Sequence, residues 1–483
     1  MLYDLLQCAH RPQMDLFGLP EKRDPISPFV QLLWEKGSLY EAEVIDNLSL
    51  PFLNLRGESR AQREALTYDA MRRREPLIYA GRIASGDLLG DPDLLRLEDD
   101  GYVAGDIKSG AGEEDDGSGP NLKKHYGVQI ALYTDILERL GFSGSRRPFI
   151  WDGLGHEVVY DLNAPIGKRD PVTLWTVYQD MLALAQQVVA GSGDTVAAYG
   201  SKCKLCHWRS ACVEDLEAID DLSLLPDLGR ARRDVIAEQI PTISALAKAN
   251  INQLITGSES PFPGVGANTL KTLHERAQLA TRPNPKPYRK TTILLPKAST
   301  ELFFDIEVDP MRDICYLHGF IERHNNNPKT EKFVPFFAED TSTAEEERVF
   351  ADALQYIDSK QPCVLYFYSK YERTWYRNLQ ERYPSVCSEA DIETLFDPLR
   401  AIDLYYDVVR KYTEWPTRDF SIKTLAKYLG FNWRDTDPSG AASIEWFHRW
   451  VETGDEEIKQ RILDYNEDDC IATRVLLDGI KDL

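Results

Sequence analysis

The sequence predicts a multidomain α/β protein in which two α/β regions flank a helical segment. Strand-like and helix-like patterns alternate over residues 1–217 and again over residues 298–483. Residues 218–297 are mostly helical in pattern and end in a proline-rich, basic stretch that is typical of a linker. A chain of 483 residues, 43% of them hydrophobic, is long enough for each region to bury its own core.

Composition limits the functions that the chain can serve. The formal net charge is −22 at pH 7, whereas a protein that only coats nucleic acid is usually basic. A nuclease is compatible with this charge, because carboxylates hold divalent cations that restore positive charge locally. No apolar run is long enough to cross a membrane, and the N-terminus does not resemble a signal peptide. We therefore expect a cytoplasmic protein with no membrane partner, in which clustered cysteines bind metal.

Residues 78–108 contain a first predicted metal site. DLLRL and YVAGDIK read as two strands of a hairpin joined by the turn EDDG. Asp106 and Lys108 are two residues apart and project to the same face, and Asp93 lies near the start of the facing strand. This set suits phosphodiester hydrolysis, because carboxylates hold Mg²⁺ or Mn²⁺ and a lysine stabilises developing negative charge. D-x-K in isolation favours a solvated, salt-bridged strand over a metal site. The segment that follows, residues 110–121, is expected to be a mobile loop of glycine and acidic residues.

Two predicted helices extend this set of residues. Gln129 and Tyr133 are four residues apart on an amphipathic helix and share one face, and Glu41 lies on another helix four residues after Gly37. The series G-x3-E, G-x-P-D, D-x-K and Q-x3-Y resembles the RecB-like nucleases of the PD-(D/E)xK superfamily over residues 1–215. The resemblance implies a restriction-endonuclease-like α/β nuclease core.

The resemblance also implies a role for each residue of the series. Glu41, Asp93 and Asp106 would bind the catalytic metal, Lys108 would be the catalytic lysine, and Gln129 and Tyr133 would support the site and the substrate strand. Many RecB-like nucleases have histidine where Glu41 stands and glutamate where Asp106 stands, and both replacements keep a ligand. Asp87 also follows a glycine and is the alternative to Asp93.

Residues 201–212, SKCKLCHWRSAC, hold three cysteines spaced C-x2-C-x5-C. Three thiols this close predict a metal site whose fourth ligand lies elsewhere. Some RecB-like nucleases carry a [4Fe–4S] cluster held by one cysteine before the nuclease core and three after it. That resemblance implies the ligands Cys8, Cys203, Cys206 and Cys212. Zinc is the alternative metal, because it also takes four cysteines.

Residues 222–280 contain two glycine-bearing turns, LPDLG and PFPGVG, each followed by a predicted helix. They resemble helix–hairpin–helix units, whose turns offer backbone N–H groups to a phosphate. Six Lys and Arg residues stand against one acid between residues 271 and 290. Nucleic-acid contacts are therefore expected at Gly264, Gly266, Lys271, Arg289 and Lys290. A helical spacer with a solvated face is the alternative.

A second acidic site is predicted in the last region. LFFDIEV reads as a buried strand with Asp305 and Glu307 on one face, where two acids are costly unless they hold metal. Tyr465 and Asp469 are four residues apart on the C-terminal helix, and Glu372 follows a strand between the two motifs. This order resembles the DEDD 3′–5′ exonucleases of the RNase H-like fold, in particular the YprB-type domain, over about residues 299–483.

Such enzymes hold two divalent ions that activate water and stabilise the leaving oxygen. The resemblance implies that the ligands are Asp305, Glu307, Glu372 and Asp469, and that Tyr465 orients the attacking water. The second acidic motif of this family usually ends in aspartate, so Asp403 is the alternative to Glu372.

Together the motifs predict a nuclease that depends on Mg²⁺ or Mn²⁺. We expect hydrolysis of nucleic acid from its ends, with DNA favoured over RNA, in DNA repair, processing or defence. One alternative is an assembly factor that has one or both sites inactive and binds nucleic acid for a separate helicase. The chain has no G-x4-G-K-[ST] motif, so a helicase would be another protein. Another alternative is a zinc-bearing processing factor that acts on RNA.

Overall fold

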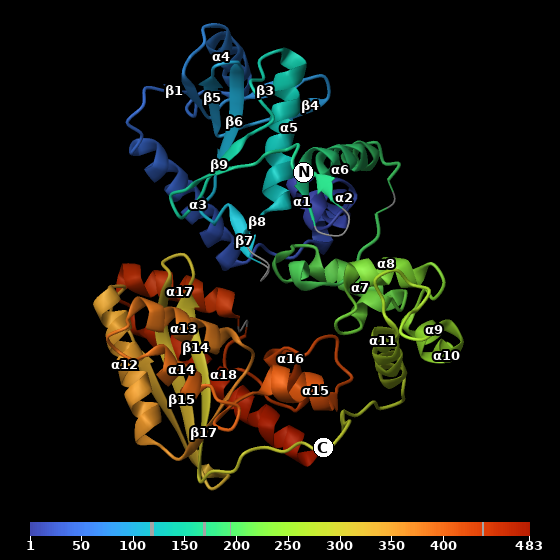
Figure 1. The fold of residues 1–483 in the computed structure, drawn as a ribbon, viewed down its shortest axis with the longest axis vertical. Helices are drawn as coiled ribbons and strands as arrows, with labels where there is room; N and C mark the ends of the chain where they lie inside the picture. Colours follow the sequence, from blue (N-terminus) through green and yellow to red (C-terminus); the bar gives the residue numbers. More distant parts are fainter. Residues whose placement is uncertain (116–119, 168–170, 194, 437–438) are drawn as a thin grey trace. The chain divides into compact units, whose positions relative to one another are not determined.

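The computed structural model of the protein divides into two compact units, each with its own sheet and core (Figure 1). Unit 1 comprises Met1–Ala197 and Ser201–Val213, and unit 2 comprises Ala198–Gly200 and Glu214–Leu483. None of the helices that the structure describes is both long enough and apolar enough to span a membrane. The described residues are 1–115, 120–167, 171–193, 195–436 and 439–483.

Unit 1 is built on a six-stranded mixed sheet with the strand order β1-β2-β5-β6-β9-β10. The predicted hairpin is confirmed: Leu94 of β5 lies opposite Gly105 of β6 in an antiparallel pair. Every residue of β6 is buried, because helices cover both faces of the sheet at this strand. The strands are β1 (Leu53–Asn54), β2 (Leu77–Tyr79), β5 (Leu94–Glu98), β6 (Gly101–Ile107), β9 (Phe149–Trp151) and β10 (Glu157–Val159).

The helices of unit 1 bury the two faces of this sheet in separate cores. Helix α5 packs against β6 and α6, and α1 packs against both helices. Ile45 of α3 belongs to the core on the other face, together with Val103 and Ile107 of β6. The helical segments are α1 (Leu2–Gln7), α2 (His10–Phe17), η1 (Pro20–Lys22), α3 (Pro28–Asp46), α4 (Arg60–Arg72), α5 (Lys124–Leu140), α6 (Leu174–Val189) and η2 (Ser201–Leu205).

Three two-stranded ribbons complete unit 1. One of them, β7–β8, lies in the predicted loop at residues 110–121, so part of that segment pairs as an antiparallel ribbon. Residues 116–119 of the same segment lie outside the described residues. The ribbons are β3 (Ile83–Ser85) with β4 (Leu88–Gly90), β7 (Glu113–Asp115) with β8 (Pro120–Leu122), and β11 (Pro165–Ile166) with β12 (Val172–Thr173).

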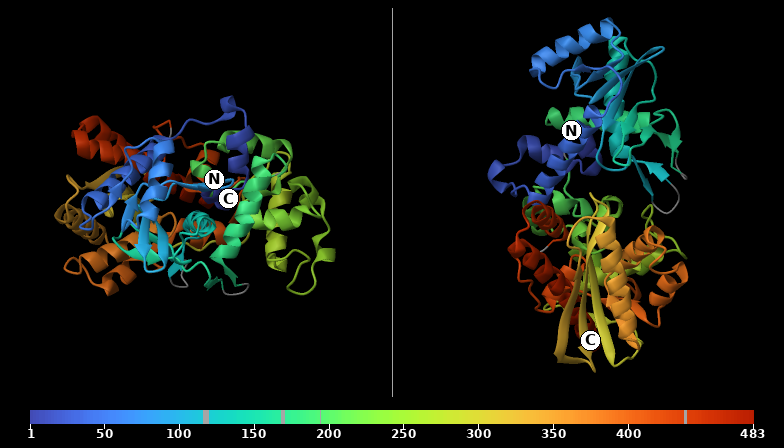
Figure 2. Two further views of the ribbon diagram at one scale, coloured as in Figure 1. Left: turned by 90° about the horizontal axis from the view of Figure 1, so that it is seen from above. Right: turned by 90° about the vertical axis from the view of Figure 1, so that its left-hand side faces the viewer.

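Unit 2 contains a five-stranded mixed sheet with the order β16-β15-β14-β17-β18. The predicted alternation along β14 is confirmed: Phe304, Ile306 and Val308 enter one core, whereas Phe303 enters another. Helices lie on both faces of the sheet, as Figure 2 shows from a second side. The strands are β14 (Thr300–Asp309), β15 (Ile314–His324), β16 (Asn327–Phe337), β17 (Cys363–Phe367) and β18 (Ala401–Asp403).

The C-terminal helix α18 packs against three strands of this sheet, and α12 packs against β15 and β16. The π-helix η4 and the short helix α15 follow β18 directly. The helical segments after residue 340 are α12 (Thr343–Ser359), α13 (Tyr371–Arg382), α14 (Glu389–Leu395), η4 (Leu404–Val409), α15 (Arg410–Tyr412), α16 (Ile422–Tyr428), α17 (Gly440–Thr453) and α18 (Glu456–Asp482).

The segment between the two predicted nuclease regions forms several short helices. The proline-rich stretch that follows them contains β13 (Tyr288–Arg289), which pairs with β19 (Thr413–Glu414). The segment belongs to unit 2. Its helices are η3 (Leu222–Leu224), α8 (Gly229–Ala237), α9 (Ile243–Lys248), α10 (Ile251–Leu254) and α11 (Ala267–Ala280), and α7 (Arg209–Ala218) precedes them.

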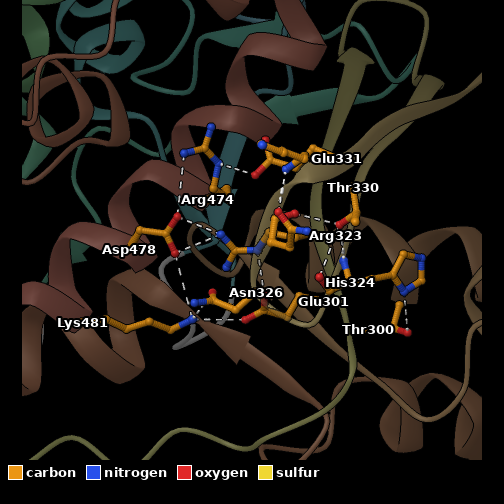
Figure 3. Close-up of polar contacts among 12 residues, drawn as sticks. Thr300, Glu301, Arg323, His324, Asn326, Thr330, Glu331, Arg474, Asp478 and Lys481 are labelled. Carbon is orange, nitrogen blue, oxygen red and sulfur yellow. Dashed lines mark hydrogen bonds and ion pairs between the residues drawn. The ribbon is translucent and has the colours of Figure 1, made fainter.

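A charge network fixes α18 along the sheet of unit 2 (Figure 3). Arg323 of β15 is 1% exposed, and its Nε lies 2.7 Å from Oε2 of Glu301 on β14. Its Nη1 lies 2.7 Å from Oδ2 of Asp478 on α18, and Lys481 of the same helix pairs with Glu301 at 3.2 Å. Paired and hydrogen-bonded charges are tolerated in a buried setting, and these pairs connect α18 with β14 and β15.

Candidate active sites

Unit 2 gathers three carboxylates between its sheet and its C-terminal helix. Asp305 and Glu307 lie on β14 and Asp469 lies on α18, and one oxygen from each lies within 4.8 Å of the other two. Across the described residues, no other set of three His, Cys, Asp or Glu side chains brings its ligand atoms this close. Carboxylate oxygens at this spacing can hold a divalent cation such as Mg²⁺ or Mn²⁺.

Burial and mutual repulsion perturb all three acids. The pKa of Glu307 is raised to about 8, mainly by burial and also by the nearby charge of Asp469. Burial also places the pKa of Asp305 well above its ordinary value, and Asp469 and Glu307 contribute. The pKa of Asp469 is raised by burial, although Lys423 and two hydrogen bonds oppose the shift. Without a cation Glu307 retains a proton at neutral pH, so cation binding there would be coupled to proton release.

Neighbouring side chains orient these carboxylates. Trp433 Nε1 donates to Oδ1 of Asp469 at 2.7 Å, and Asn466 Nδ2 donates to Oδ2 of Asp305 at 2.9 Å. Gly319 lies opposite Asp305 on β15, and a Cβ there would lie 1.6 Å from Oδ1 of Asn466. Glycine at this position therefore leaves the space that Asn466 needs to reach Asp305.

The structure distinguishes Glu372 from Asp403, the two residues proposed for the fourth acid. Glu372 on α13 is 3% exposed, and its Oε2 has no hydrogen-bond partner among the described residues. Its charge raises the pKa of Asp305, so the two carboxyls are close. Asp403 instead caps η4, because its Oδ1 accepts from the backbone N–H groups of Tyr405, Tyr406 and Ser369. The geometry favours Glu372 as the ligand.

Two further residues border the acidic cluster. The Tyr465 side chain is 3% exposed, and Lys423 Nζ on α16 donates to its hydroxyl at 2.7 Å. Lys423 also lies near enough to lower the pKa of Asp305, Glu307 and Asp469. No sequence motif indicated Lys423, because it lies more than forty residues before Tyr465 and carries no spacing signal. Only the packing of α16 against α18 brings it to the site.

Asp468, the immediate neighbour of Asp469, is held away from the cluster. Arg434 donates to it through Nε at 3.0 Å and through its backbone N–H at 2.8 Å. Consecutive residues of a helix point in directions about 100° apart, so only one of the two acids can face β14. That residue is Asp469, as the Y-x3-D spacing predicts.

Unit 1 brings three of its predicted residues together at the end of β6. Asp106 is 1% exposed, and its Oδ2 lies 2.6 Å from Nζ of Lys108. Asp93 precedes β5, and its Oδ2 accepts from the backbone N–H of Ile107 at 2.8 Å. Burial lowers the pKa of Lys108, but Asp106 and Asp93 outweigh this effect and raise it overall. The lysine is therefore charged between two carboxylates.

Gln129 and Tyr133 lie beside this group on α5. Gln129 Nε2 donates to the hydroxyl of Tyr133 at 3.0 Å. Burial raises the pKa of Tyr133 far above its ordinary value, and Asp106 and Asp93 raise it further, which places the phenol next to both acids. A Cβ at Gly90 would lie 2.5 Å from the Tyr133 ring, so glycine at this position makes room for it.

Glu41 is held by two residues that the sequence motifs did not include. Tyr79 donates its hydroxyl to Oε1 of Glu41 at 2.8 Å, and Nη1 of Arg56 lies 3.1 Å from the same oxygen. The pKa of Arg56 is raised overall, and Asp93 is one cause, so the guanidinium lies within range of both acids. Glu41, Asp93 and Asp106 are consequently not a closely spaced ligand set in this structure.

Asp87, the alternative to Asp93, lies between β3 and β4. Its Oδ2 accepts from Nε2 of Gln186 on α6 at 2.8 Å. Asp93, by contrast, is near enough to Asp106 for the two charges to interact. The structure therefore makes Asp93, and not Asp87, the neighbour of Asp106.

The four clustered cysteines come from the two ends of unit 1. The pKa of Cys206 is raised by burial and also by Cys8 and Cys203, so the three thiols lie within range of one another's charges, although no three cysteine sulfurs among the described residues come within 4.8 Å of one another. Asp15 of α2 joins the same two segments, because its Oδ1 accepts from Nε1 of Trp208 at 2.8 Å. Cys212 follows one turn later on α7. The fold thus brings Cys8 near the cysteine-rich segment that begins almost two hundred residues later in the chain.

The predicted nucleic-acid contacts of the middle segment lie on α11 and β13. Gly264, with φ of +74°, and Gly266 precede α11 directly, and Lys271 and Arg289 are exposed. Lys290 is exposed as well, although its Nζ lies 2.7 Å from Oε1 of the fully buried Glu414. Arg276 of the same basic stretch is 7% exposed and also pairs with Glu414. Two of the basic residues are therefore paired with one buried acid of unit 2.

Family models match both halves of the chain. Residues 10–213 match the PD-(D/E)XK nuclease superfamily, and residues 302–480 match the RNase_H superfamily. No curated protein and no solved structure matched the chain. The chain therefore carries a PD-(D/E)XK nuclease superfamily domain followed by an RNase H superfamily domain.

Proposed function

We propose that this protein is a metal-dependent nuclease with an exonuclease site in unit 2 and a second nuclease site in unit 1. The observation that carries the proposal is the placement of Asp305, Glu307 and Asp469, whose oxygens lie within 4.8 Å of one another. The two nuclease-superfamily domains support it. By resemblance to the DEDD exonucleases, the preferred substrate is DNA and the polarity is 3′ to 5′.

In unit 2, Asp305, Glu307, Asp469 and Glu372 are the residues that would hold Mg²⁺ or Mn²⁺. The donor set fits, because all four supply hard oxygen ligands and one oxygen of Glu372 is buried without a partner. The bound ions supply water activation and stabilisation of the leaving oxygen. Tyr465, fixed by Lys423, is placed to orient the attacking water, while Trp433 and Asn466 hold the carboxylates in position.

In unit 1, Asp93 and Asp106 would hold the cation, and Lys108 would contact the phosphate and stabilise its developing charge. Glu41 would complete the ligand set by exchanging its contact with Arg56 for the cation. Gln129 and Tyr133 support the site from α5.

For the cysteines, we propose a [4Fe–4S] cluster held by Cys8, Cys203, Cys206 and Cys212, with zinc as the alternative. Four thiols from the two ends of unit 1 would close it around the nuclease core, so that metal-binding energy becomes folding energy. Iron analysis and absorbance at about 400 nm of anaerobically purified protein distinguish the two metals.

The test of nuclease function is a cleavage panel on end-labelled and internally labelled DNA and RNA, single- and double-stranded, with Mg²⁺ or Mn²⁺. Asp106→Ala and Asp305→Ala inactivate the two sites in turn, and Asp87→Asn and Asp464→Asn are matched controls at acids outside them. We expect each inactivating variant to abolish one cleavage activity and each control to retain both. The absence of cleavage of every substrate by the wild-type protein would refute the proposal.

One observation favours a second function for unit 1, binding of nucleic acid without cleavage for a separate helicase. Arg56 forms an ion pair with Glu41, and the acids of this site are not as closely spaced as those of unit 2. If the Asp305→Ala protein still cleaves and the added Lys108→Ala substitution removes that cleavage, binding without cleavage is excluded. If the Asp305→Ala protein binds nucleic acid as well as the wild type but cleaves none, binding without cleavage is supported.

A further inference from the structure

Three aromatic rings gather beside Lys108 in unit 1. Tyr3 of α1 packs edge-on against His125 of α5, with ring centroids 4.9 Å apart. Tyr3 is also stacked with Tyr126, at 6.3 Å and an interplanar angle of 27°. Nζ of Lys108 lies 5.8 Å from the centroid of the Tyr126 ring. An aromatic surface therefore adjoins the residue expected to contact the phosphate.

The packing of α1 against the core does not require an aromatic side chain at Tyr3. Leu2 and Leu5 anchor this helix in the core and are 7% and 3% exposed, whereas Tyr3 keeps 36% of its surface exposed. His125 and Tyr126 are also partly exposed. Aromatic side chains with accessible faces provide stacking area that an aliphatic anchor lacks.

Positive charge surrounds the same rings. Nζ of Lys123 lies 5.3 Å from the Tyr126 centroid and donates to the backbone oxygen of Ala111 at 2.7 Å. The pKa of His125 is lowered mainly by burial and also by the charges of Lys123 and Lys202, so Lys202 of the cysteine-rich segment lies near this ring. Glu114 and Asp4 also lie within range of His125 and Tyr3, and Asp106 pairs with Lys108 at 2.6 Å. Three lysines therefore lie around the three rings, with these acids beside them.

We propose that Tyr3, His125 and Tyr126 form a stacking site for an unpaired nucleobase of the strand whose phosphate lies at Lys108. Aromatic rings interleaved with cations are the usual means of binding single-stranded nucleic acid, because every base has a π-face and every link a phosphate. Bases inside a duplex are stacked on one another, so this site selects single-stranded ends or stretches. The inference rests on the proposed function of unit 1 and names its substrate class.

The first test uses the full-length wild-type protein with Ca²⁺ in place of Mg²⁺, with gels to verify that the oligonucleotide stays intact. Binding of labelled single-stranded oligonucleotides is measured by anisotropy, with intact bases or with two abasic nucleotides at either end. Stacking predicts that abasic nucleotides at the bound end weaken binding by about 5-fold to about 150-fold.

The second test combines this probe with substitutions, because unit 2 also binds the oligonucleotide if it is a nuclease. Tyr3→Leu should weaken binding and remove most of the abasic penalty, whereas Tyr3→Phe, which keeps the ring, should retain both. Phe17→Leu on α2 removes another exposed ring and should change neither. Thermal unfolding of each variant verifies the fold, and His125→Ala replaces Tyr3→Leu if that variant does not fold.

The outcomes separate this inference from the proposed function. An abasic penalty that is absent, or that survives Tyr3→Leu unchanged, overturns the stacking site even if the protein cleaves nucleic acid. Ring-dependent binding without any cleavage supports the stacking site and refutes the nuclease. Failure to bind any single-stranded oligonucleotide overturns the stacking site as well.

Discussion

At the scale of single residues, both sites combine buried carboxylates with one lysine. Lys108 contacts Asp106 directly, whereas Lys423 donates to Tyr465 beside Asp469. Charges in a desolvated setting interact more strongly than in water, so each lysine offsets repulsion among its acids. The lysine of unit 1 follows its aspartate in sequence, but the lysine of unit 2 reaches its site only through helix packing.

Lys423→Met should lower the kcat of the unit 2 site by roughly tenfold to a thousandfold, a range typical for loss of one electrostatic contact. Affinity for Mn²⁺ should not fall, because the substitution removes a positive charge near the ligands. Cleavage is measured in the Asp106→Ala background so that only unit 2 contributes. Lys427→Met, at an exposed position of the same helix, is the matched control, and an unchanged kcat for Lys423→Met would contradict this role.

Glu372 and Asp403 should respond differently to substitution. Burial raises the pKa of Glu372 well above its ordinary value, so Glu372→Gln should weaken Mn²⁺ binding, measured by calorimetry, without destabilising the metal-free protein. Asp403→Ala removes the cap of η4 and should cost about 0.5–2 kcal/mol of stability, measured by denaturant unfolding. Loss of Mn²⁺ binding in Asp403→Ala but not in Glu372→Gln would reverse the assignment.

At the scale of elements, α18 and β14 form the acidic site by facing each other. Asp305 and Glu307 are two residues apart on a strand, so they share a face, and Tyr465 and Asp469 share a face of the helix. These two periodicities were readable from the sequence. The ion pairs of Arg323 with Glu301 and Asp478 connect α18 with β14 and β15, and no local pattern predicts them.

This arrangement predicts that metal-free unit 2 loses stability as pH rises from about 4.5 to about 8. The pKa of Glu307 is raised from 4.5 to about 8, so the folded state holds a proton that the unfolded state releases in this range. Stability then falls with pH, by an amount on the order of a few kcal/mol. Thermal unfolding of metal-free protein between pH 5 and pH 8 measures the slope.

Saturating Mn²⁺ should reduce or reverse that slope, because the cation replaces the protons and binds only the folded site. Asp305→Asn with Glu307→Gln should flatten it in the absence of metal, since both titrating acids are then neutral. A slope that is the same in this double variant and in the wild-type protein would contradict the assignment of the pH dependence to these acids.

At the scale of the whole molecule, each acidic site lies within one unit, so the two activities should be separable by substitution. The proposed cluster would join the segment around Cys8 to the segment around Cys203, at the two ends of unit 1. A cross-link between residues so far apart in sequence removes considerable chain entropy from the unfolded state.

Cys8→Ala should therefore abolish absorbance at about 400 nm and lower the thermal unfolding midpoint of unit 1, because one ligand and the closure are lost. Calorimetry of the anaerobically purified protein checks both units, and unit 2 should retain its own transition. Cys387→Ala changes a half-buried thiol of unit 2 and is the control. Unchanged iron content and unfolding in Cys8→Ala would refute the cysteine cluster.

The sequence by itself determined the two α/β regions, the strand and helix that carry each acidic motif, and the face on which each acid lies, because these follow from local periodicity. Only the tertiary structure decided that Glu372 has an unpartnered oxygen while Asp403 caps a helix, that Arg56 contacts Glu41, and that Lys423 reaches Tyr465. It also brought Tyr3 to Lys108, across more than one hundred residues. Such contacts depend on how separate elements pack, and packing leaves no fixed spacing in the chain.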